Sequence, residues 1–281
     1  MTTLILTEKF SPLVDERFAP SAVTTASTNQ DYEFTGAKGI KITSVQTVEM
    51  NDYERSGQAR YGKADELKND IQEEIMRKDR AFTFTMDKMN EEESEVKVAP
   101  AIARQMREVV IPEIETYRLK VMSDEAGTKV DGAITKENAY ESFLAGQEVL
   151  DDHFVPENRV CHATPAFINK IKLDDNYTKA SDLAQGTILM KGQVAEVDGV
   201  AIIKTPKSFM NGQEFIITHK SATVAPVKLA ETKVHLDPPG ISGTLVEGRF
   251  YYDAFVLDMK KKAIYTHAGG AEKVEKATAK K

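Results

Sequence analysis

The sequence predicts an α+β fold, because strand-like and helix-like patterns both occur and occupy successive stretches of the chain. Apolar and polar residues alternate over residues 36–48 and again over 81–89, as in half-buried strands. Apolar residues then recur at steps of three and four over 102–121, which predicts a long helix with one apolar stripe. Asp198-Gly199 separates two short apolar runs and favours a type I′ hairpin turn.

Size and composition allow a sizeable core and narrow the classes of function. The chain has 281 residues, 41% of them hydrophobic, so it can form one elaborated domain or two modest ones. A formal net charge of −7 argues against a dedicated nucleic-acid binder. The single cysteine, Cys161, cannot form an intramolecular disulfide, which is compatible with a reducing cytoplasm. The sequence shows neither a signal-peptide pattern nor a long apolar run, so no membrane contact is expected.

Two stretches near the N-terminus are predicted to lie outside any core. Residues 1–35 lack periodicity, so we expect an extended arm that becomes ordered by lying on another surface. Residues 49–80 are highly charged with few apolar residues, which predicts a projecting hairpin that packs on a neighbouring subunit. Leu67, Ile71 and Ile75 recur every four residues, however, and leave open a helix in the returning arm of this hairpin.

The long helix has a recognisable start and a predicted irregularity. Asn90 and the glutamates after it are typical of a helix N-terminus, so the helix is expected at about 91–122. Pro112 lies inside the apolar stripe and should kink the helix. The polar stretch 123–132 is predicted to be a linker and a domain boundary.

Beyond this linker, helices and strands are predicted to mix. Pro165 suits the first turn of a helix. The other expected elements are a helix at 136–152, a strand at 159–163, hairpin strands at 194–197 and 200–204, and further strands at 214–218, 233–236 and 244–258. The last dozen residues are expected to be a frayed tail.

Several short phrases stand in a fixed order over most of the chain. They are Arg80-Ala81-Phe82-Thr83-Phe84 with Asp87 and Met89, Ile111-Pro112-Glu113-Ile114-Glu115-Thr116-Tyr117-Arg118, Arg159-Val160 with Thr164-Pro165, Val197-Asp198-Gly199-Val200 with Pro206, and Gly248-Arg249 with Tyr252-Asp253-Ala254-Phe255-Val256. In order and spacing they resemble the major capsid proteins of tailed bacteriophages of the Hong Kong 97 type. Asn90 and Glu115 stand where relatives often carry aspartate, but Asn also caps a helix and Glu keeps the charge.

The resemblance implies a Hong Kong 97-type capsid fold with four parts. These are an N-terminal arm, an extended β-hairpin loop, a peripheral domain with a long spine helix, and an axial domain. The implied boundaries are 1–35 for the arm, 44–84 for the extended loop, 36–43 with 85–128 and 228–251 for the peripheral domain, about 91–122 for the spine helix within it, 129–227 with 252–268 for the axial domain, and 269–281 for a flexible tail.

The resemblance also implies a function and its partners. Copies of the chain would assemble as hexamers and pentamers into the icosahedral head of a virion, after synthesis in the host bacterial cytoplasm. Double-stranded DNA would be enclosed with only weak contacts, because the subunit is acidic. A separate scaffolding protein, a portal and decoration proteins are further expected partners. The alternatives are an encapsulin-like shell around a cargo enzyme, a phage tail or baseplate component, and an unrecognised soluble enzyme.

No residue pattern predicts catalysis, a cofactor or a metal site, so the chain is predicted not to be an enzyme. The five histidines lack metal-ligand spacing, and Asp151-Asp152-His153 is better explained as a solvated helix end. The loop residues that could contact another subunit belong to types enriched at interfaces, although a solvated hairpin remains the alternative. These candidate inter-subunit contacts are Tyr53, Arg55, Arg60, Tyr61, Arg77 and Arg80. A second group of residues is singled out as the spine-helix motif of the resemblance: Pro112, Glu113, Glu115, Tyr117 and Arg118.

Overall fold

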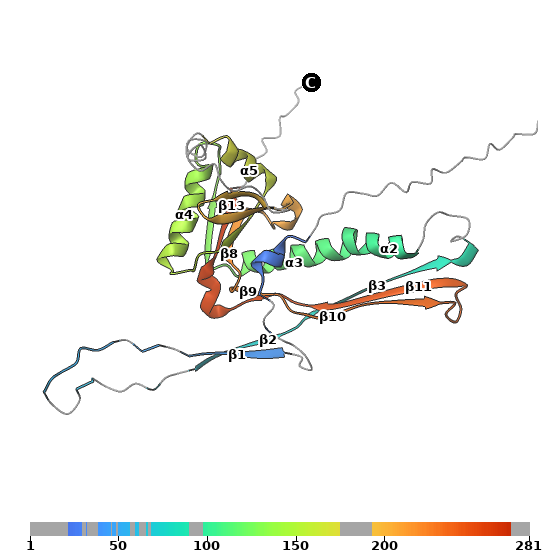
Figure 1. Cartoon of the computed structure of the whole chain (residues 1–281), viewed down its shortest axis with the longest axis horizontal. Coiled ribbons are helices and arrows are strands. Elements are labelled where there is room, and N and C mark those ends of the chain that lie inside the picture. Colours follow the sequence, from blue (N-terminus) through green and yellow to red (C-terminus); the bar gives the residue numbers. More distant parts are fainter. Residues whose placement is uncertain are drawn as a thin grey trace, which may run out of the picture.

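A six-stranded sheet, a three-stranded sheet and a projecting hairpin divide the α+β chain into a body, a platform and an arm-like extension (Figure 1). The structure is a computed structural model. The residues that it describes are 22–29, 32, 39–45, 47–48, 50–56, 60–61, 66, 69–89, 98–174 and 193–270.

The body is built on the six-stranded sheet. Its strands, in spatial order, are β4 (Thr128–Gly132), β13 (Ile264–Gly269), β8 (Gln213–His219), β5 (Arg159–Ala163), β7 (Val200–Lys204) and β6 (Gln193–Val197). β4 runs parallel to β13 and β5 runs parallel to β7, whereas the other neighbours are antiparallel. Phe215, Ile216 and Ile217 are all fully buried in β8, so both faces of the sheet are covered.

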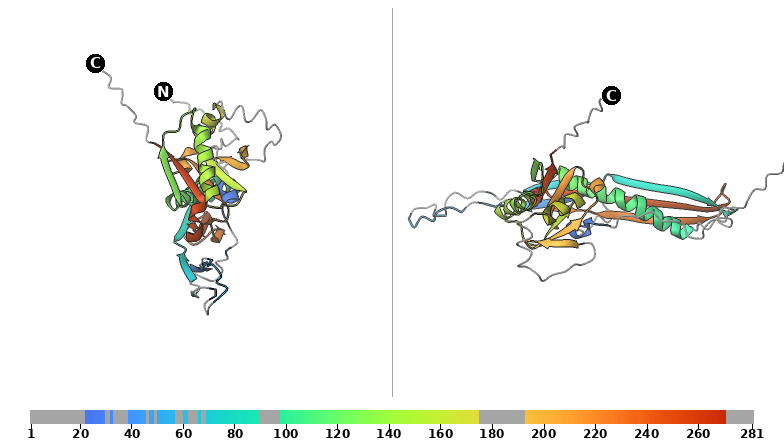
Figure 2. Two further views of the ribbon diagram at one scale, coloured as in Figure 1. Left: turned by 90° about the vertical axis from the view of Figure 1, so that its left-hand side faces the viewer. Right: turned by 90° about the horizontal axis from the view of Figure 1, so that it is seen from above.

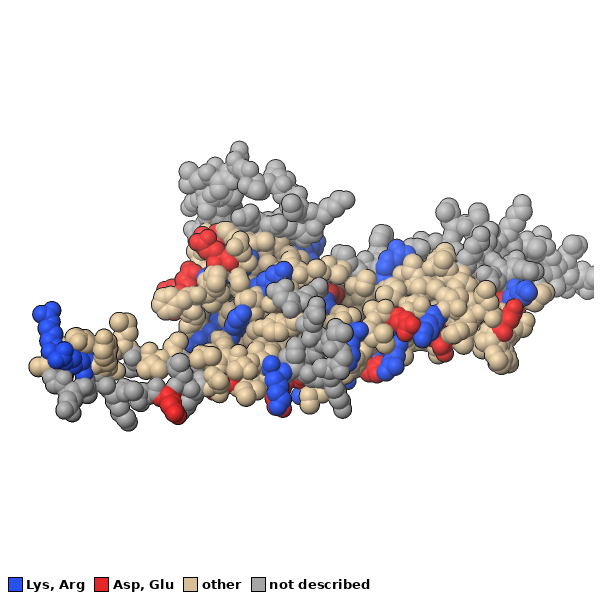
Figure 3. All heavy atoms as spheres, turned by 60° about the horizontal axis from the view of Figure 1, so that its bottom comes forward, with Lys and Arg blue, Asp and Glu red and all other residues tan. Residues whose placement is uncertain are grey.

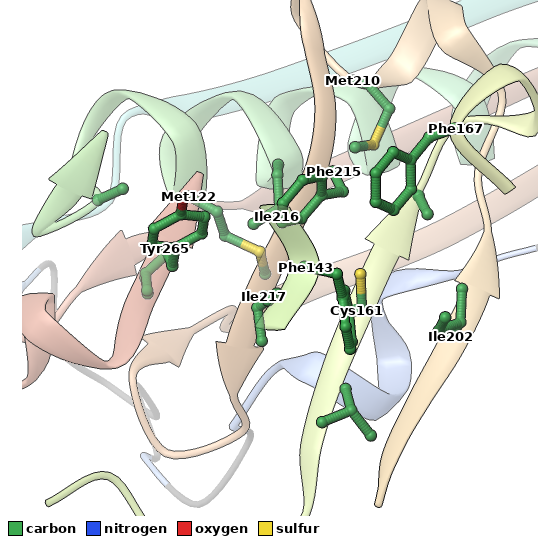
Figure 4. Packing of buried hydrophobic residues seen from close by; sticks show 14 of the residues in the cluster. Met122, Phe143, Cys161, Phe167, Ile202, Met210, Phe215, Ile216, Ile217 and Tyr265 are labelled. Atoms are coloured by element: carbon green, nitrogen blue, oxygen red, sulfur yellow. The ribbon is translucent and has the colours of Figure 1, made fainter. Parts of the chain in front are cut away.

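One face of this sheet is covered by two helices, α4 (Ala139–Asp152) and α5 (Pro165–Lys172). The ring of Phe215 stacks on Phe167 of α5 with centroids 4.4 Å apart and also contacts Phe143 of α4 at 6.2 Å (Figure 4). Tyr265 of β13 stacks on the same ring at 5.9 Å. This aromatic cluster is the centre of the body's core, and aromatic packing of this kind stabilises beyond its buried area.

The platform is a long helix lying along the three-stranded sheet (Figures 1 and 2). The helix has 27 residues and consists of α2 (Val98–Gln105), the π-helical turn η2 (Met106–Val110) and α3 (Ile111–Asp124). The sheet consists of β10 (Val227–Leu236), β11 (Gly243–Tyr252) and β3 (Lys78–Asp87), all antiparallel. Val110, Phe250 and Tyr252 form the small core between helix and sheet.

The projecting hairpin pairs β1 (Gly39–Val45) with β2 (Asn69–Ile75) and points away from the platform (Figure 1). Ile71 and Ile75 therefore lie in a strand, so the helical alternative for the returning arm is wrong there; Leu67 lies outside the described residues. Pairing with β1 overrides the four-residue periodicity, because strand preference depends mainly on tertiary context.

Short elements connect these parts. They are η1 (Thr24–Ser27), η3 (Lys207–Phe209), β9 (Thr223–Val224), β12 (Phe255–Val256) and η4 (Asp258–Ala263). β12 pairs with β9 in a small separate sheet.

Most predicted elements of the body are confirmed. The strand 159–163 has the predicted bounds, and α5 begins at Pro165 with Thr164 as its cap. Asp198 and Gly199 have φ values of 52° and 73°, which are those of a type I′ turn. The predicted tail begins too early, because β13 continues to Gly269; residues 271–281 lie outside the described part.

The predicted linker at 123–132 is wrong. The helix continues to Asp124, and Thr128–Gly132 is strand β4. β4 is an edge strand with three exposed residues at its centre, so it lacks the apolar alternation of a half-buried strand. The helix continues through Pro112. The π-helical turn Met106–Val110 lies just before the segment α3 that contains this proline. The predicted helix start at Asn90 lies outside the described residues.

Gly127 joins the helix to β4 and is packed against backbone. Its N–H donates to the Lys261 carbonyl at 2.8 Å, and an added Cβ would lie 2.5 Å from that oxygen. We expect Gly127→Ala to lower the free energy of unfolding by about 1–3 kcal/mol, measured by chemical denaturation. Gly132→Ala is the matched control, because its Cβ would meet only the His267 ring at 3.6 Å. Equal losses in both variants would contradict the packing argument.

Candidate functional site

Glu115, from the predicted spine-helix motif, joins the long helix to the N-terminal segment. Its carboxylate is 2% exposed and accepts hydrogen bonds from the N–H groups of Val23 at 2.9 Å and Thr24 at 2.7 Å. The Thr24 hydroxyl donates to its other oxygen at 2.9 Å. The carboxylate thus caps the free N–H groups at the start of η1. The described part of the predicted arm therefore lies on the chain's own body.

Arg118, one turn further along the helix, is also buried and balances this carboxylate. Its Nη1 lies 3.5 Å from Glu115 Oε1 and 3.3 Å from the Thr24 hydroxyl. Burial lowers the pKa of Arg118, while the charge of Glu115 opposes this effect. Because a buried ion pair stabilises mainly by satisfying both partners, removal of one partner leaves an uncompensated charge.

His162 holds the same N-terminal segment from the sheet. It lies in β5 and is fully buried, with Nε2 2.7 Å from the Ser27 hydroxyl and Nδ1 3.4 Å from the Thr205 hydroxyl. Burial lowers the pKa of His162 to about 4, so the ring is neutral at physiological pH. Two residues after Ser27, Asn29 forms an isolated β-bridge to Val224.

Tyr117 links the long helix to the base of the hairpin through Asp253. The Tyr117 hydroxyl donates to Asp253 Oδ1 at 2.6 Å, and the backbone N–H of Arg77 donates to Oδ2 at 2.7 Å. Burial and the adjacent carboxylate raise the pKa of Tyr117. Arg77, predicted as an inter-subunit contact, thus has its main chain tied to its own body.

Arg80 and Glu113 pair on the exposed side of the platform. Arg80 Nε lies 2.6 Å from Glu113 Oε1, and the Tyr252 hydroxyl donates to the same oxygen at 3.4 Å. Burial, followed by the charge of Glu113, raises the pKa of Tyr252 to about 12. The two charges are therefore satisfied within one subunit.

Four of the predicted loop contacts come together at the far end of the hairpin. The rings of Tyr53 and Tyr61 meet edge to face with centroids 5.0 Å apart, and the N–H of Glu54 donates to the Arg60 carbonyl at 3.0 Å. Tyr61 is 84% exposed, and Arg55 and Arg60 are also exposed. Figure 3 shows basic side chains at this tip. The tip is thus an exposed aromatic and basic surface.

The base of the hairpin is anchored by residues that sequence reasoning missed. Gln72 Nε2 donates to the Val256 carbonyl at 3.0 Å, while Gln72 Oε1 accepts from the N–H of Asp258 at 2.9 Å. The Tyr251 hydroxyl donates to the Met76 carbonyl at 2.9 Å. The sequence contained one signal for this anchor. Gln72 is an amide and Met76 is apolar, and both stand among charged residues in a segment that was predicted to project into solvent.

Within the described residues, no group of three or more His, Cys, Asp or Glu could hold a metal ion. Cys161 is fully buried, and burial raises the pKa of its thiol, which disfavours the reactive thiolate. In the part of the chain that the structure describes, no helix is both long and apolar enough to span a membrane.

The chain matches known proteins in structure but not in sequence. No protein-family model matches the chain, and no curated protein sequence does. A chain from Mycobacterium phage Che8 is structurally similar, with a TM-score of 0.77 and 15% identity over 95% of this chain and 98% of that one. Two structures described as phage capsids match to a similar extent. The chain has the phage capsid fold of the Hong Kong 97 type.

These two structures resemble the chain over the same extent as the Che8 chain does. The capsid of cyanophage P-SCSP1u gives a TM-score of 0.73 and 14% identity, over 94% of this chain and 93% of that one. The mature capsid of bacteriophage PhiM1 gives 0.73 and 14%, over 94% and 92%. The capsid fold thus covers nearly the whole chain, and the predicted fold class is confirmed at this level.

The buried ion pair at Glu115 predicts a large effect on stability for substitution of this residue. Glu115→Gln should lower the free energy of unfolding by about 3 kcal/mol, because Arg118 then remains buried without its counter-charge. Adding Arg118→Met should recover most of the loss. The exposed control Glu113→Gln should change stability by less than about 1 kcal/mol. Chemical denaturation of the free subunit measures all three, and equal effects of the two glutamate variants would be inconsistent with a buried joint.

His162 predicts a pH dependence of stability. Its folded-state pKa of about 4 lies below the ordinary value of 6.5, so the unfolded chain binds the proton more tightly. This contribution is intact above pH 6.5 and is lost as the pH falls toward 4. Between pH 7.5 and 5 we expect it to lower the free energy of unfolding by about 2 kcal/mol relative to His162→Gln. Parallel pH profiles for the two proteins would refute this.

Proposed function

We propose that the chain is a major capsid protein that assembles with copies of itself into the icosahedral head of a tailed bacteriophage. The observation that carries the proposal is the extent of the structural likeness. It spans more than nine-tenths of both chains in three comparisons, so it includes the long helix and the hairpin as well as the core. A fold alone does not determine function. The hairpin, however, projects from the subunit (Figure 1), so its contacts have to come from another molecule.

The hairpin supports self-assembly because it has little core of its own. Ile71 and Ile75 are 59% and 51% exposed on its two-stranded sheet, and Tyr61 is exposed at its tip. A two-stranded hairpin in water needs a third surface to stabilise it. A neighbouring copy of the chain supplies that surface in a shell, where one patch of each subunit meets a different patch on the next.

The parts are assigned by this proposal as follows. Residues 1–35 form the N-terminal arm, of which 22–29 are clasped to the body. The hairpin and its base correspond to the extended loop, for which the expected range is 44–84, although strand β1 of the hairpin begins earlier, at Gly39, and the end of that range belongs to β3. The platform corresponds to the peripheral domain with its spine helix. The body corresponds to the axial domain at 129–227 and 252–268, which would cluster around the axes of hexamers and pentamers.

The enclosed genome and the other partners follow from the same proposal. A net charge of −7 offers few phosphate contacts, so double-stranded DNA would be held weakly inside the shell. Assembly would use a separate scaffolding protein, and a portal and decoration proteins would complete the virion. Two of the compared structures are described as phage capsids, which favours a head over a tail component or a cargo compartment.

Assembly is tested by concentrating the purified chain and examining it by negative-stain electron microscopy beside size-exclusion chromatography. We expect hexamers, pentamers or closed polyhedral shells. Long tubes of uniform narrow bore would overturn the head assignment and indicate a tail component.

The hairpin tip gives a matched test. Arg60→Glu combined with Tyr61→Ala should leave the melting temperature of the free subunit within about 2 °C of wild type, because both side chains are exposed. Shell formation should be lost, because the tip surface contacts a neighbour. Lys220→Glu, an exposed change on the body, is the control for net charge. Normal shells from the tip variant would exclude the tip as a contact.

A further inference from the structure

The loop after α4 presents an aromatic ring to solvent from a strained backbone. Phe154 is 93% exposed, and its φ of 55° is in the left-handed region that favours glycine. The other non-glycine residues with positive φ in the described chain are Asn158, Asp198, Asn211 and Asp237. Asn and Asp tolerate this conformation, whereas phenylalanine is an outlier. Because the ring is almost fully exposed, its packing within the subunit does not offset this backbone strain.

The backbone around Phe154 is held in place by the end of the helix. The N–H of Phe154 donates to the Asp151 carbonyl at 2.8 Å, and the N–H of Val155 donates to the Leu150 carbonyl at 3.0 Å. This pair of bonds is the Schellman motif, in which the Phe154 position is usually glycine. Leu150 and Val155 are buried and complete its apolar contact.

A buried guanidinium group, that of Arg159, forms hydrogen bonds to the same loop. Arg159 is 6% exposed, and its Nη2 donates to the Val155 carbonyl at 2.6 Å and to Asp151 Oδ1 at 2.5 Å. Its Nη1 donates to Gln147 Oε1 at 2.8 Å, and its Nε donates to the Pro156 carbonyl at 3.2 Å. The loop is therefore pre-organised, so little conformational freedom would be lost on binding.

We propose that Phe154 is an anchor by which the loop 151–158 docks on a second copy of this chain. This rests on the proposed assembly. Rigid, exposed aromatic side chains are the type that dominates binding energy at interfaces. Helix α4 lies on the side of the body toward which the hairpin projects (Figures 1 and 2). The copy that receives the hairpin therefore also faces this loop.

The loop that carries Phe154 also carries the exposed acidic residues Asp152 and Glu157. We expect the receiving patch on the other copy to be apolar at its centre and basic at its rim. Contact between two different patches is the arrangement of a head-to-tail contact.

Strain and docking predict opposite effects for one substitution. Phe154→Gly should raise the melting temperature of the free subunit by about 2 °C, because glycine suits the backbone. The same change should raise the critical concentration for assembly about tenfold, because the anchor is lost. Phe154→Ala should weaken assembly equally without the gain in stability. Leu173→Ala, which removes another exposed apolar side chain from the body, is the control.

The outcomes separate this inference from the proposed function. Failure of the wild type to assemble overturns the proposed function and the docking with it. If the wild type assembles and Phe154→Gly assembles at the same concentration, only the docking is wrong.

The docking is tested directly by a photo-reactive phenylalanine analogue at position 154, with mass spectrometry of the peptides that are linked in assembled particles. We expect adducts with another copy of the chain. Adducts confined to the same copy would overturn the docking.

Discussion

Burial of one carboxylate constrains how the main parts of the subunit fit together. Glu115 lies on the long helix, receives the N–H groups of Val23 and Thr24, and is balanced by Arg118. One turn further on, Leu119 is fully buried in the core of the body. A buried charge is tolerated only when it is hydrogen-bonded. Movement of the helix along its axis would therefore cost free energy, because Glu115 or Arg118 would lose its partners. A polar joint thus sets the register that apolar packing alone would leave adjustable.

Asp253 provides a second joint, and the two together determine where the hairpin points. Tyr117 and the main chain of Arg77 both donate to Asp253, so the helix and the hairpin base share one carboxylate. Gln72 adds two hydrogen bonds further out along the hairpin. The base is therefore rigid, while Tyr53 and Tyr61 are exposed at the other end. In a shell, a rigid base would aim the tip, and the tip would adapt to neighbours in five-fold and six-fold positions.

Local patterns in the sequence were sufficient to predict two kinds of element: strands with a recognisable apolar pattern, and turns that require particular residues. The Asp198-Gly199 turn and the strand 159–163 are predicted because their signals lie within a few residues. The joints are not predictable in this way, because Thr24 and Glu115 lie 91 residues apart and Tyr117 and Asp253 lie 136 apart. The segment 22–29 was predicted as part of an arm that lies on another surface, but the sequence did not indicate which surface. The segment binds the body through polar groups, which leave no apolar periodicity. The resemblance singled out Glu115 and Tyr117, but not what they hold.

The exposed edge of the platform explains why such subunits would form closed shells and not fibres. β10 is an edge strand with nearly all its residues exposed, and unpaired edges favour strand-to-strand association. Charged side chains lie among other residues on the platform (Figure 3), with Lys233 paired to Glu231 on β10 and Arg249 of β11 paired to Asp79 of β3. These charges are satisfied within the subunit and oppose a second strand at the edge. In the proposed assembly, association would then depend on the hairpin and the Phe154 loop, both of which expose apolar groups. Their placement at one end of the molecule would favour a directional, ring-forming contact.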